Sequence, residues 1–240
     1  MKKIHLLSAI IAMALCSCGA NPPESNNNNN GKNENAPALS PEKIEVLFED
    51  SVQVTSLNCD ITRWEIKNDY VAIVDEKGLI EGLHVGTTTL TAYYTLENTE
   101  YSLTAEVIVK GKSELFKDPI LDFSMTNKDI EKTLGTPTQD LTSDAYQTLV
   151  YGDINKDSYI TCYDFFNDKL IEVRICLANE EMVEELEDFL SERYEMDEEE
   201  EMIIVFIDAY EKKDATINVT FRIDNVFGQR VLTVSYKPAE

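Results

Sequence analysis

The sequence predicts two folded domains, an all-β sandwich over residues 42–111 followed by an α+β domain over residues 113–240. In the first segment, short runs of alternating apolar residues are separated by glycine-containing turns, a pattern typical of antiparallel strands. In the second segment, two stretches with apolar residues at helical spacing are interspersed with period-two runs, in the order α-βββ-α-βββ. The length of 240 residues accommodates both domains. We expect the two helices to pack on one face of an antiparallel sheet.

Residues 1–18 have the three parts of an export signal peptide. Lys2 and Lys3 precede an apolar run over residues 6–15, and small residues follow that run. The run is about half of the ~20 residues that a membrane-spanning helix needs. We therefore expect this segment to direct export and then to be removed.

The end of this segment, Leu15-Cys16-Ser17-Cys18, resembles the lipobox of bacterial lipoproteins. The resemblance implies that the Cys18 thiol carries a diacylglycerol and that Cys16 stays in the discarded peptide. Two or three acyl chains hold a protein stably at a membrane, so the expected location is the outer membrane or the cell surface. Ordinary cleavage with release is the alternative. Gly19 gives no signal for inner-membrane retention, so the membrane face stays open.

Residues 19–41 contain almost no apolar side chains and include five consecutive asparagines. A segment of this composition buries too little surface to offset the entropy lost on ordering. It is predicted to be a disordered tether between the lipid anchor and the first folded domain.

The strands of the first domain are predicted from alternation. Apolar residues share one face near each end of the domain: Ile44, Val46 and Phe48, then Leu103, Ala105, Val107 and Val109. Trp64 begins a middle strand and is expected in the core. His84 lies in a turn without an acidic or cysteine partner at ligand spacing, so we expect it to be solvated.

The stretch over residues 64–92, WEIKNDYVAIVDEKGLIEGLHVGTTTLTA, resembles the bacterial immunoglobulin-like domain, group 2. Glycines at 78, 82 and 86 punctuate β-branched runs, and glycine is the residue that takes positive φ most readily in turns. The resemblance implies a β-sandwich of the kind found in bacterial surface adhesins and as a spacer in exported proteins. It implies no active site.

The second domain is predicted to begin with a short helix within residues 125–137. Thr126 can cap its first turn, and Asp129 can return the bond to complete a capping box. Gly135 supplies the stop, and Pro137 blocks continuation. The string Met-Thr-x-x-Asp-Ile-x-x-x-Leu-Gly-x-Pro weakly resembles the first helix of small outer-membrane lipoproteins of the barrel-assembly machinery and of the β-lactamase-inhibitor-protein fold.

Strands are predicted over residues 148–151, 159–166 and 170–177, and Asn167-Asp168 is a favourable two-residue hairpin turn. An uninterrupted register from this turn places Cys162 inside and Cys176 outside, which disfavours a disulfide between them. With Cys59, three cysteines remain after the leader, so at least one is expected to stay free.

A second helix is predicted over residues 180–194, with one apolar stripe and one acidic face. An acidic turn follows over residues 197–201, and strands follow over residues 202–207, 217–223 and 232–236. The acidic cluster of residues 180–201 is interpreted as a solvated face, with a docking surface for a basic partner as the alternative.

Asp153, Asn155, Asp157 and Asp164 have the spacing of positions 1, 3, 5 and 12 in a calcium loop. The string GDINKDSYITCYD also resembles one repeat of a dockerin. Ser158 stands where the loop needs glycine, no second repeat follows, and the next residues alternate as a strand does. The favoured interpretation is therefore a polar turn between strands, with calcium as the only candidate cofactor.

The formal net charge of −24 excludes nucleic acid, whose phosphates require basic surface, and favours a soluble monomer. After the leader the chain holds one histidine, His84, and it has no phosphate-binding glycine loop, CxxC or HExxH motif. Catalysis is therefore not expected.

We expect a non-catalytic, membrane-anchored lipoprotein of the adhesion type, whose immunoglobulin-like spacer presents the α+β domain to a protein or glycan ligand. Two alternatives stay open. One is a periplasm-facing accessory or inhibitor-like lipoprotein that docks on a membrane-protein complex. The other is a small carbohydrate-active enzyme with paired carboxylates.

Overall fold

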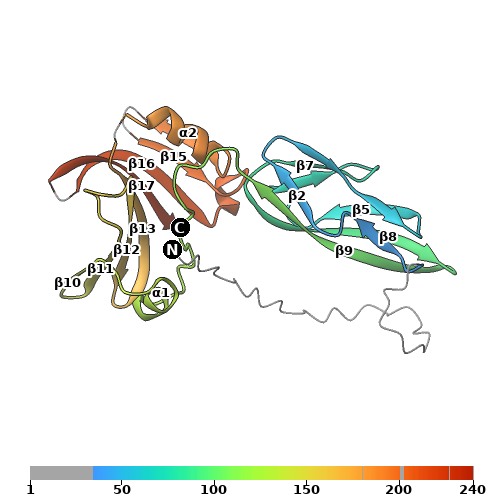
Figure 1. Cartoon of the computed structure of the whole chain (residues 1–240), viewed down its shortest axis with the longest axis horizontal. Helices are drawn as coiled ribbons and strands as arrows, with labels where there is room; N and C mark the ends of the chain where they lie inside the picture. Colours follow the sequence, from blue (N-terminus) through green and yellow to red (C-terminus); the bar gives the residue numbers. More distant parts are fainter. Residues whose placement is uncertain (1–34, 180, 201–202, 227, 240) are drawn as a thin grey trace, which may run out of the picture.

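A computed structural model describes residues 35–179, 181–200, 203–226 and 228–239 of the chain (Figure 1). Within these ranges the chain is mostly strand and contains two α-helices, so the expected β-rich class with two helices is confirmed. The export signal, Cys18 and most of the predicted tether lie outside the described residues. The expectation of disorder is wrong for Ala38–Ser40 of that tether, which form strand β1 and bury Leu39 in the core, because they pair with β4 (Thr55–Leu57). Among the residues described, no helix has both the length and the apolar character needed to cross a membrane.

The first part of the chain, residues 38–110, forms three sheets. A four-stranded sheet has the order β2-β9-β8-β5, a three-stranded sheet has the order β3-β7-β6, and β1 pairs with β4. The strands are β1 (Ala38–Ser40), β2 (Ile44–Leu47), β3 (Ser51–Gln53), β4 (Thr55–Leu57), β5 (Ile61–Ile66), β6 (Ala72–Val74), β7 (Leu79–Gly82), β8 (Gly86–Leu96) and β9 (Thr99–Lys110).

The four-stranded and three-stranded sheets share one core. Ile44, Leu90 and Val107 of the first sheet and Ile80 of the second are fully buried in it. Trp64 is partly buried against this core, and its ring leaves no room for a side chain at position 78, where φ is +80°. One strand pair departs from the expected antiparallel arrangement, because β2 runs parallel to β9. The long connection through the other strands makes that parallel return feasible.

The second part forms a single eight-stranded sheet with the order β10-β11-β12-β13-β17-β16-β15-β14. The elements are α1 (Asn127–Leu134), β10 (Gln139–Ser143), β11 (Tyr146–Tyr151), β12 (Tyr159–Phe166), β13 (Lys169–Leu177), α2 (Val183–Ser191), β14 (Glu195–Glu200), β15 (Ile203–Ile207), β16 (Ile217–Val226) and β17 (Gln229–Pro238). Each helix is followed by a four-stranded meander, and the two meanders join where β13 pairs antiparallel with β17.

The expected order α-βββ-α-βββ lacks one strand in each half. The two missed strands, β10 and β14, are the edges of the sheet. Their sequences, QDLTS and EMDEEE, are polar because an edge strand contacts solvent and charged side chains there discourage further pairing. The acidic turn expected over residues 197–201 is therefore wrong for residues 197–200, which belong to β14.

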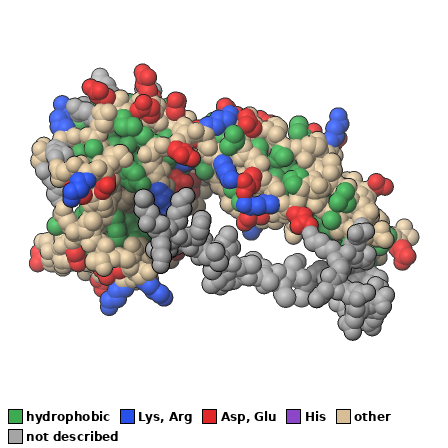
Figure 2. Space-filling model, in the orientation of Figure 1, with side chains coloured by type: hydrophobic (Ala, Val, Ile, Leu, Met, Phe, Trp, Pro, Cys, Tyr) green, Lys and Arg blue, Asp and Glu red, His purple; other side chains and the backbone are tan. Residues whose placement is uncertain are grey.

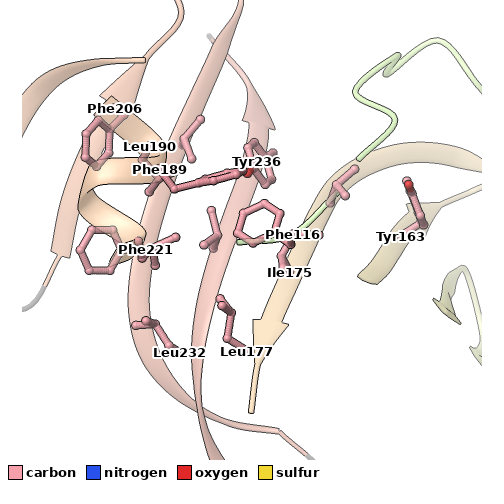
Figure 3. Packing of buried hydrophobic residues seen from close by; sticks show 14 of the residues in the cluster. Phe116, Tyr163, Ile175, Leu177, Phe189, Leu190, Phe206, Phe221, Leu232 and Tyr236 are labelled. Carbon is pink, nitrogen blue, oxygen red and sulfur yellow. The ribbon is translucent and has the colours of Figure 1, made fainter. Parts of the chain in front are cut away.

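The helices follow their sequence signals. Thr126 and Asp129 form the expected capping box at the start of α1, and Gly135 follows its last turn with φ of +86°. Leu186, Phe189 and Leu190 of α2 are fully buried. In Figure 3, Phe189 and Leu190 point toward Phe206, Phe221 and Tyr236 on the strands. Phe116, from the segment that connects the two parts, completes this core.

A register shift in the β12–β13 hairpin changes the faces that the sequence predicts. Asp164 pairs with Glu172 but Phe165 pairs with Leu170, so Ile171 is an extra residue on β13. Beyond this bulge, Ile160 lies opposite Cys176 and Cys162 lies opposite Arg174. The prediction that the two cysteines lie on opposite faces is therefore wrong: Cys162 lies on the face away from Val173 and Ile175, together with Cys176, and Cys176 is buried there. Cys162 and Cys176 share one face and are 2% and 0% exposed.

Glu192, one residue beyond α2, joins the two parts of the chain. Its buried carboxylate accepts hydrogen bonds from the backbone amides of Lys112 (2.9 Å) and Ser113 (3.0 Å) and from the Ser113 hydroxyl (2.8 Å). Its backbone carbonyl accepts a bond from the Val85 amide at 2.7 Å. The connecting segment is thus fixed to the end of α2.

An aromatic cluster extends this junction. The ring of His84 stacks on Tyr70, with 4.0 Å between centroids, and Tyr210 packs edge-on against Tyr70. The Tyr70 hydroxyl accepts a bond from the Glu195 amide at 3.1 Å and lies 3.2 Å from the carbonyl oxygen of Arg193. Burial raises the pKa of Tyr70 well above its ordinary value. His84 is only 6% exposed, so the expectation of a solvated histidine is wrong, because the second part of the chain covers this turn.

Candidate functional site

The two faces of the eight-stranded sheet differ in character. Side chains of both helices share a core with alternate residues of the central strands, including Leu149, Val173 and Tyr236. The residues between them point to the opposite side, because successive side chains on a strand alternate between faces. We call this opposite side the polar face, and it is made by Thr148, Asp164, Glu172, Arg174, Asn218, Thr220, Ser235 and Lys237.

Strand register brings these polar residues into line across the sheet. Arg174 of β13 lies opposite Ser235 of β17, which lies opposite Thr220 of β16. A neighbouring row begins with Thr148 opposite Asp164, continues with Glu172, and ends with Lys237 opposite Asn218. Residues that are far apart in the sequence therefore form continuous polar rows, with Ser235 buried at their centre.

An ion pair anchors one side of the polar face. Arg174 donates from Nε and Nη2 to the two carboxylate oxygens of Asp164, at 2.6 and 2.8 Å, and Thr148 donates to the same carboxylate at 2.6 Å. The side chains of Arg174 and Asp164 are 26% and 15% exposed. The hydrogen bonds from Arg174 to Asp164 raise the pKa of the guanidinium. A bidentate pair of this kind holds both side chains in one orientation.

A second polar group lies beside the first. The hydroxyl of Ser235 donates to the Glu172 carboxylate, and the Lys237 ammonium lies 3.6 Å from the same carboxylate. Next to it is a hollow of about 280 Å³ lined by Val205, Lys212, Asn218, Thr220, Ser235, Lys237 and Pro238. The hollow thus offers ammonium, hydroxyl and amide groups at fixed positions on a sheet.

Apolar side chains border the polar face at the β10–β12 edge. Tyr146 lies opposite Phe166, their ring centroids are 4.9 Å apart, and the two residues are 59% and 41% exposed. Leu141, opposite Thr148, is 45% exposed. Exposed aromatic rings beside hydrogen-bonding groups are the usual components of a recognition surface.

A separate hollow of about 460 Å³ lies at the junction, lined in part by Phe48, His84, Tyr194, Glu195 and Tyr210. Several of these groups already hold the two parts together. His84 Nδ1 is 2.8 Å from the carbonyl oxygen of Tyr70, and its Nε2 is 3.3 Å from Glu195 Oε1. We therefore assign this cluster to the junction and the polar face to recognition.

The predicted calcium residues divide between two places. Asp153, Asn155 and Asp157 lie in the turn before β12, where the Asp153 amide donates to Asp157 and the ammonium of Lys156 lies 2.6 Å from the Asp153 carboxylate. Asp164 lies farther along β12. It is five residues beyond the start of that strand at Tyr159, which corresponds to roughly 17 Å at 3.3–3.4 Å per residue. Its carboxylate is bound to Arg174.

The residues after the turn extend as a strand and carry Asp164 away from Asp153, Asn155 and Asp157, so the structure does not bring the four predicted ligands together. In the part of the chain that the structure describes, no three His, Cys, Asp or Glu side chains are grouped to hold a metal ion. The acidic residues of α2 lie on the outside of the second part, where Figure 2 shows acidic side chains gathered.

Sequence reasoning missed the polar face. Its signal is present as polar residues at alternate positions of the later strands, Asn218-Thr220 and Thr233-Ser235-Lys237. Aligning these residues with Arg174 and Glu172 requires the bulge at Ile171 and the antiparallel join of β13 to β17. Neither the bulge nor this strand pairing can be predicted from the pattern of neighbouring residues.

Comparisons with known proteins add no family. No family model and no curated protein matches the sequence. A cysteine-rich secretory protein of Staphylococcus aureus subsp. aureus Mu50 is 9% identical, with a TM-score of 0.27 over 52% of this chain and 48% of that chain. An extracellular protein with an SCP domain from Bacillus anthracis str. Ames is 14% identical, with a TM-score of 0.26 over 55% of this chain and 50% of that chain. This chain spans about half the length of each, and similarity at these TM-scores supports no conclusion.

Proposed function

We propose that this protein is a non-catalytic lipoprotein, anchored through Cys18, whose polar face binds a protein or glycan ligand at the bacterial surface. In this proposal residues 42–111 are a group 2 immunoglobulin-like spacer and residues 113–240 are the α+β binding domain. The observation that carries the proposal is the polar face itself. Its hydrogen-bonding groups are held by ion pairs next to a hollow, on the side of the sheet opposite both described helices.

The path of the chain supports a spacer role. β2 runs parallel to β9, and Leu47 is paired with Lys110, the last residue of β9. β1 precedes β2, so the described chain enters the first part near the end remote from Lys110. The second part follows Lys110 at the other end (Figure 1). A tether attached before residue 35 would therefore place the second part farthest from its anchor.

The junction supports presentation in a fixed orientation. Glu192 binds the connecting segment, while Tyr70 and His84 from the first part pack against the second part. A ligand that meets a preoriented surface requires less ordering on binding than one that meets a mobile domain.

Binding is tested by filling the hollow. Thr220→Arg places a long side chain in it, and Thr104→Arg makes the same substitution on an exposed position of β9 as the control. The full-length variants and the wild type are compared on glycan arrays and in pull-downs from membrane extracts. We expect Thr220→Arg to lose at least tenfold in affinity for the captured ligand and Thr104→Arg to keep it. Equal retention of that ligand by all three proteins contradicts the assignment of the polar face.

Anchoring is tested by fractionation of cells that produce the wild type or Cys18→Ala. The wild type is expected in the membrane pellet, and the variant is expected to leave it. Protease treatment of intact cells then reports the membrane face. Removal of the wild-type protein supports surface display, and full protection favours the periplasm-facing accessory role instead.

A further inference from the structure

Two cysteines meet on the polar side of the β12–β13 hairpin. Cys162 lies opposite Arg174 and Cys176 lies opposite Ile160, so the two cysteines are diagonal neighbours on the same face. Both belong to a small buried cluster with Val150, Ile160 and Val231. Their thiols are free in this structure.

The surroundings give the two thiols different roles. The Cys162 thiol donates a hydrogen bond to the sulfur of Cys176, which lowers the pKa of Cys176 and raises that of Cys162. Within the hairpin, the charge of Arg174 also lowers the pKa of Cys176. Thr233 Oγ1, on β17, donates to Cys176 Sγ at 3.9 Å only in the completed sheet. Cys176 is thus the better nucleophile, because the thiolate is the reactive form.

We propose that Cys162 and Cys176 form an intramolecular disulfide when the chain folds in an oxidising compartment. The need for that compartment rests on the proposed export, whereas the pairing itself rests on the hairpin register. Cys59 lies in the first part of the chain, outside this cluster, and stays free.

The reaction is thiol–disulfide exchange with an external disulfide, such as oxidised glutathione or the active-site disulfide of a thiol oxidase. The Cys176 thiolate attacks one sulfur of that disulfide and expels the first thiolate. Cys162 then loses its proton to water and attacks Cys176 Sγ in the mixed disulfide, which expels the second thiolate. Two cysteine thiols are oxidised to one disulfide, and the donor disulfide is reduced to two thiols after it takes up two protons.

Burial fixes when the exchange takes place. Cys162 and Cys176 are nearly inaccessible once β13 is paired on both sides, with Cys176 opposite Thr233 of β17. The donor must therefore react before β17 joins the sheet. The resulting bond spans the two strands next to the bulge at Ile171 and so secures the register that brings Asp164 to Arg174.

The first test uses the full chain exported into an oxidising compartment. The protein is denatured with N-ethylmaleimide and no reductant, digested with trypsin and analysed by mass spectrometry. Trypsin separates the two cysteines into residues 157–169 and 175–193. We expect these peptides as one disulfide-linked species and Cys59 as its alkylated form. Two singly alkylated peptides, or either peptide linked to Cys59, overturn the proposal.

The second test separates the pairing from export. Full-length chain from a reducing cytosol is unfolded and refolded in a glutathione redox buffer. We expect the same linked species, which Cys59→Ser keeps and Cys162→Ala loses. Linked protein should melt roughly 5–10 °C above the reduced protein, from the stabilisation typical of a short loop. Free Cys162 and Cys176 after oxidative refolding of the wild type overturn the proposal whatever the location of the protein in the cell.

Discussion

Glu192→Gln is expected to open the connection between the two parts of the chain while both parts stay folded. The carboxylate of Glu192 accepts bonds from the amides of Lys112 and Ser113 and from the Ser113 hydroxyl. Glutamine keeps the size of the side chain but replaces one acceptor oxygen by an NH₂ group. That group can only donate, so it faces donors on the connecting segment.

The magnitude follows from the bonds that are lost. A hydrogen bond to a charged group contributes about 1.5–3 kcal/mol, and the substitution removes the charge from all three bonds and the acceptor from at least one. Water recovers part of this loss once the segment opens. A net change of about 2 kcal/mol corresponds to roughly 30-fold more of the open form. The bond between the Val85 amide and the Glu192 carbonyl is retained.

Trypsin reports this opening directly, since it cleaves after Lys112, in the segment that Glu192 holds. When opening and closing are fast, the cleavage rate follows the population of the open form. We expect cleavage at Lys112 to be roughly 30-fold faster in Glu192→Gln than in the wild type. Glu185→Gln, which removes the same charge from an exposed position of α2, serves as the control and should match the wild type.

Equal cleavage rates in Glu192→Gln and the wild type would refute the reasoning, because the carboxylate would then not hold the segment. Faster cleavage throughout the second part, with a lowered melting temperature, would also refute it. In that case Glu192 would stabilise the second part as a whole, and the junction would not be a separate element.

Thr126→Ala removes the side-chain cap of α1 and should lower the free energy of unfolding by about 1 kcal/mol, as measured by chemical denaturation. Hydrogen bonds from Thr126 lower the pKa of Asp129 in the folded protein. The ionised Asp129 carboxylate therefore stabilises the fold fully above the unfolded-state pKa of about 3.9, and this stabilisation is lost as pH falls through the lower folded-state pKa. Asp129→Asn should accordingly lower the melting temperature at pH 7 more than near pH 2; an equal loss at both would contradict this. Arg174→Met leaves the Asp164 carboxylate without its cationic partner, with only the Thr148 hydroxyl bound to it, and should lower the free energy of unfolding by roughly 2 kcal/mol after a discount for partial exposure. The double variant with Asp164→Leu should recover most of that loss.

The helices were predictable because their signals are local. The capping box of Thr126 and Asp129 and the stop at Gly135 lie within ten residues, and the apolar stripe of α2 repeats within its own length. Such signals act through bonds between neighbours in the chain. The strands that match alternating patterns were predictable for the same reason.

The missed features depend on distant residues. β10 and β14 are strands because their backbones pair with β11 and β15, although their side chains resemble those of loops. The bulge at Ile171 places Ile160 and Cys162 on the same face as Arg174 and Cys176, and no turn signal marks it. His84 is buried because residues more than a hundred positions later, including Glu195 and Tyr210, cover it. Contacts of this kind cannot be read from a window of sequence.

The position of β17 in the sheet has a consequence for biogenesis. β17, the last of the described strands, lies between β13 and β16, so the two meanders have no direct connection in the sheet until β17 arrives. A chain emerging amino end first can complete its first part early, but the second part must wait for β17. Until then β13 keeps an unpaired edge, and a deletion of residues 229–238 would leave that edge permanently open to pairing with other chains.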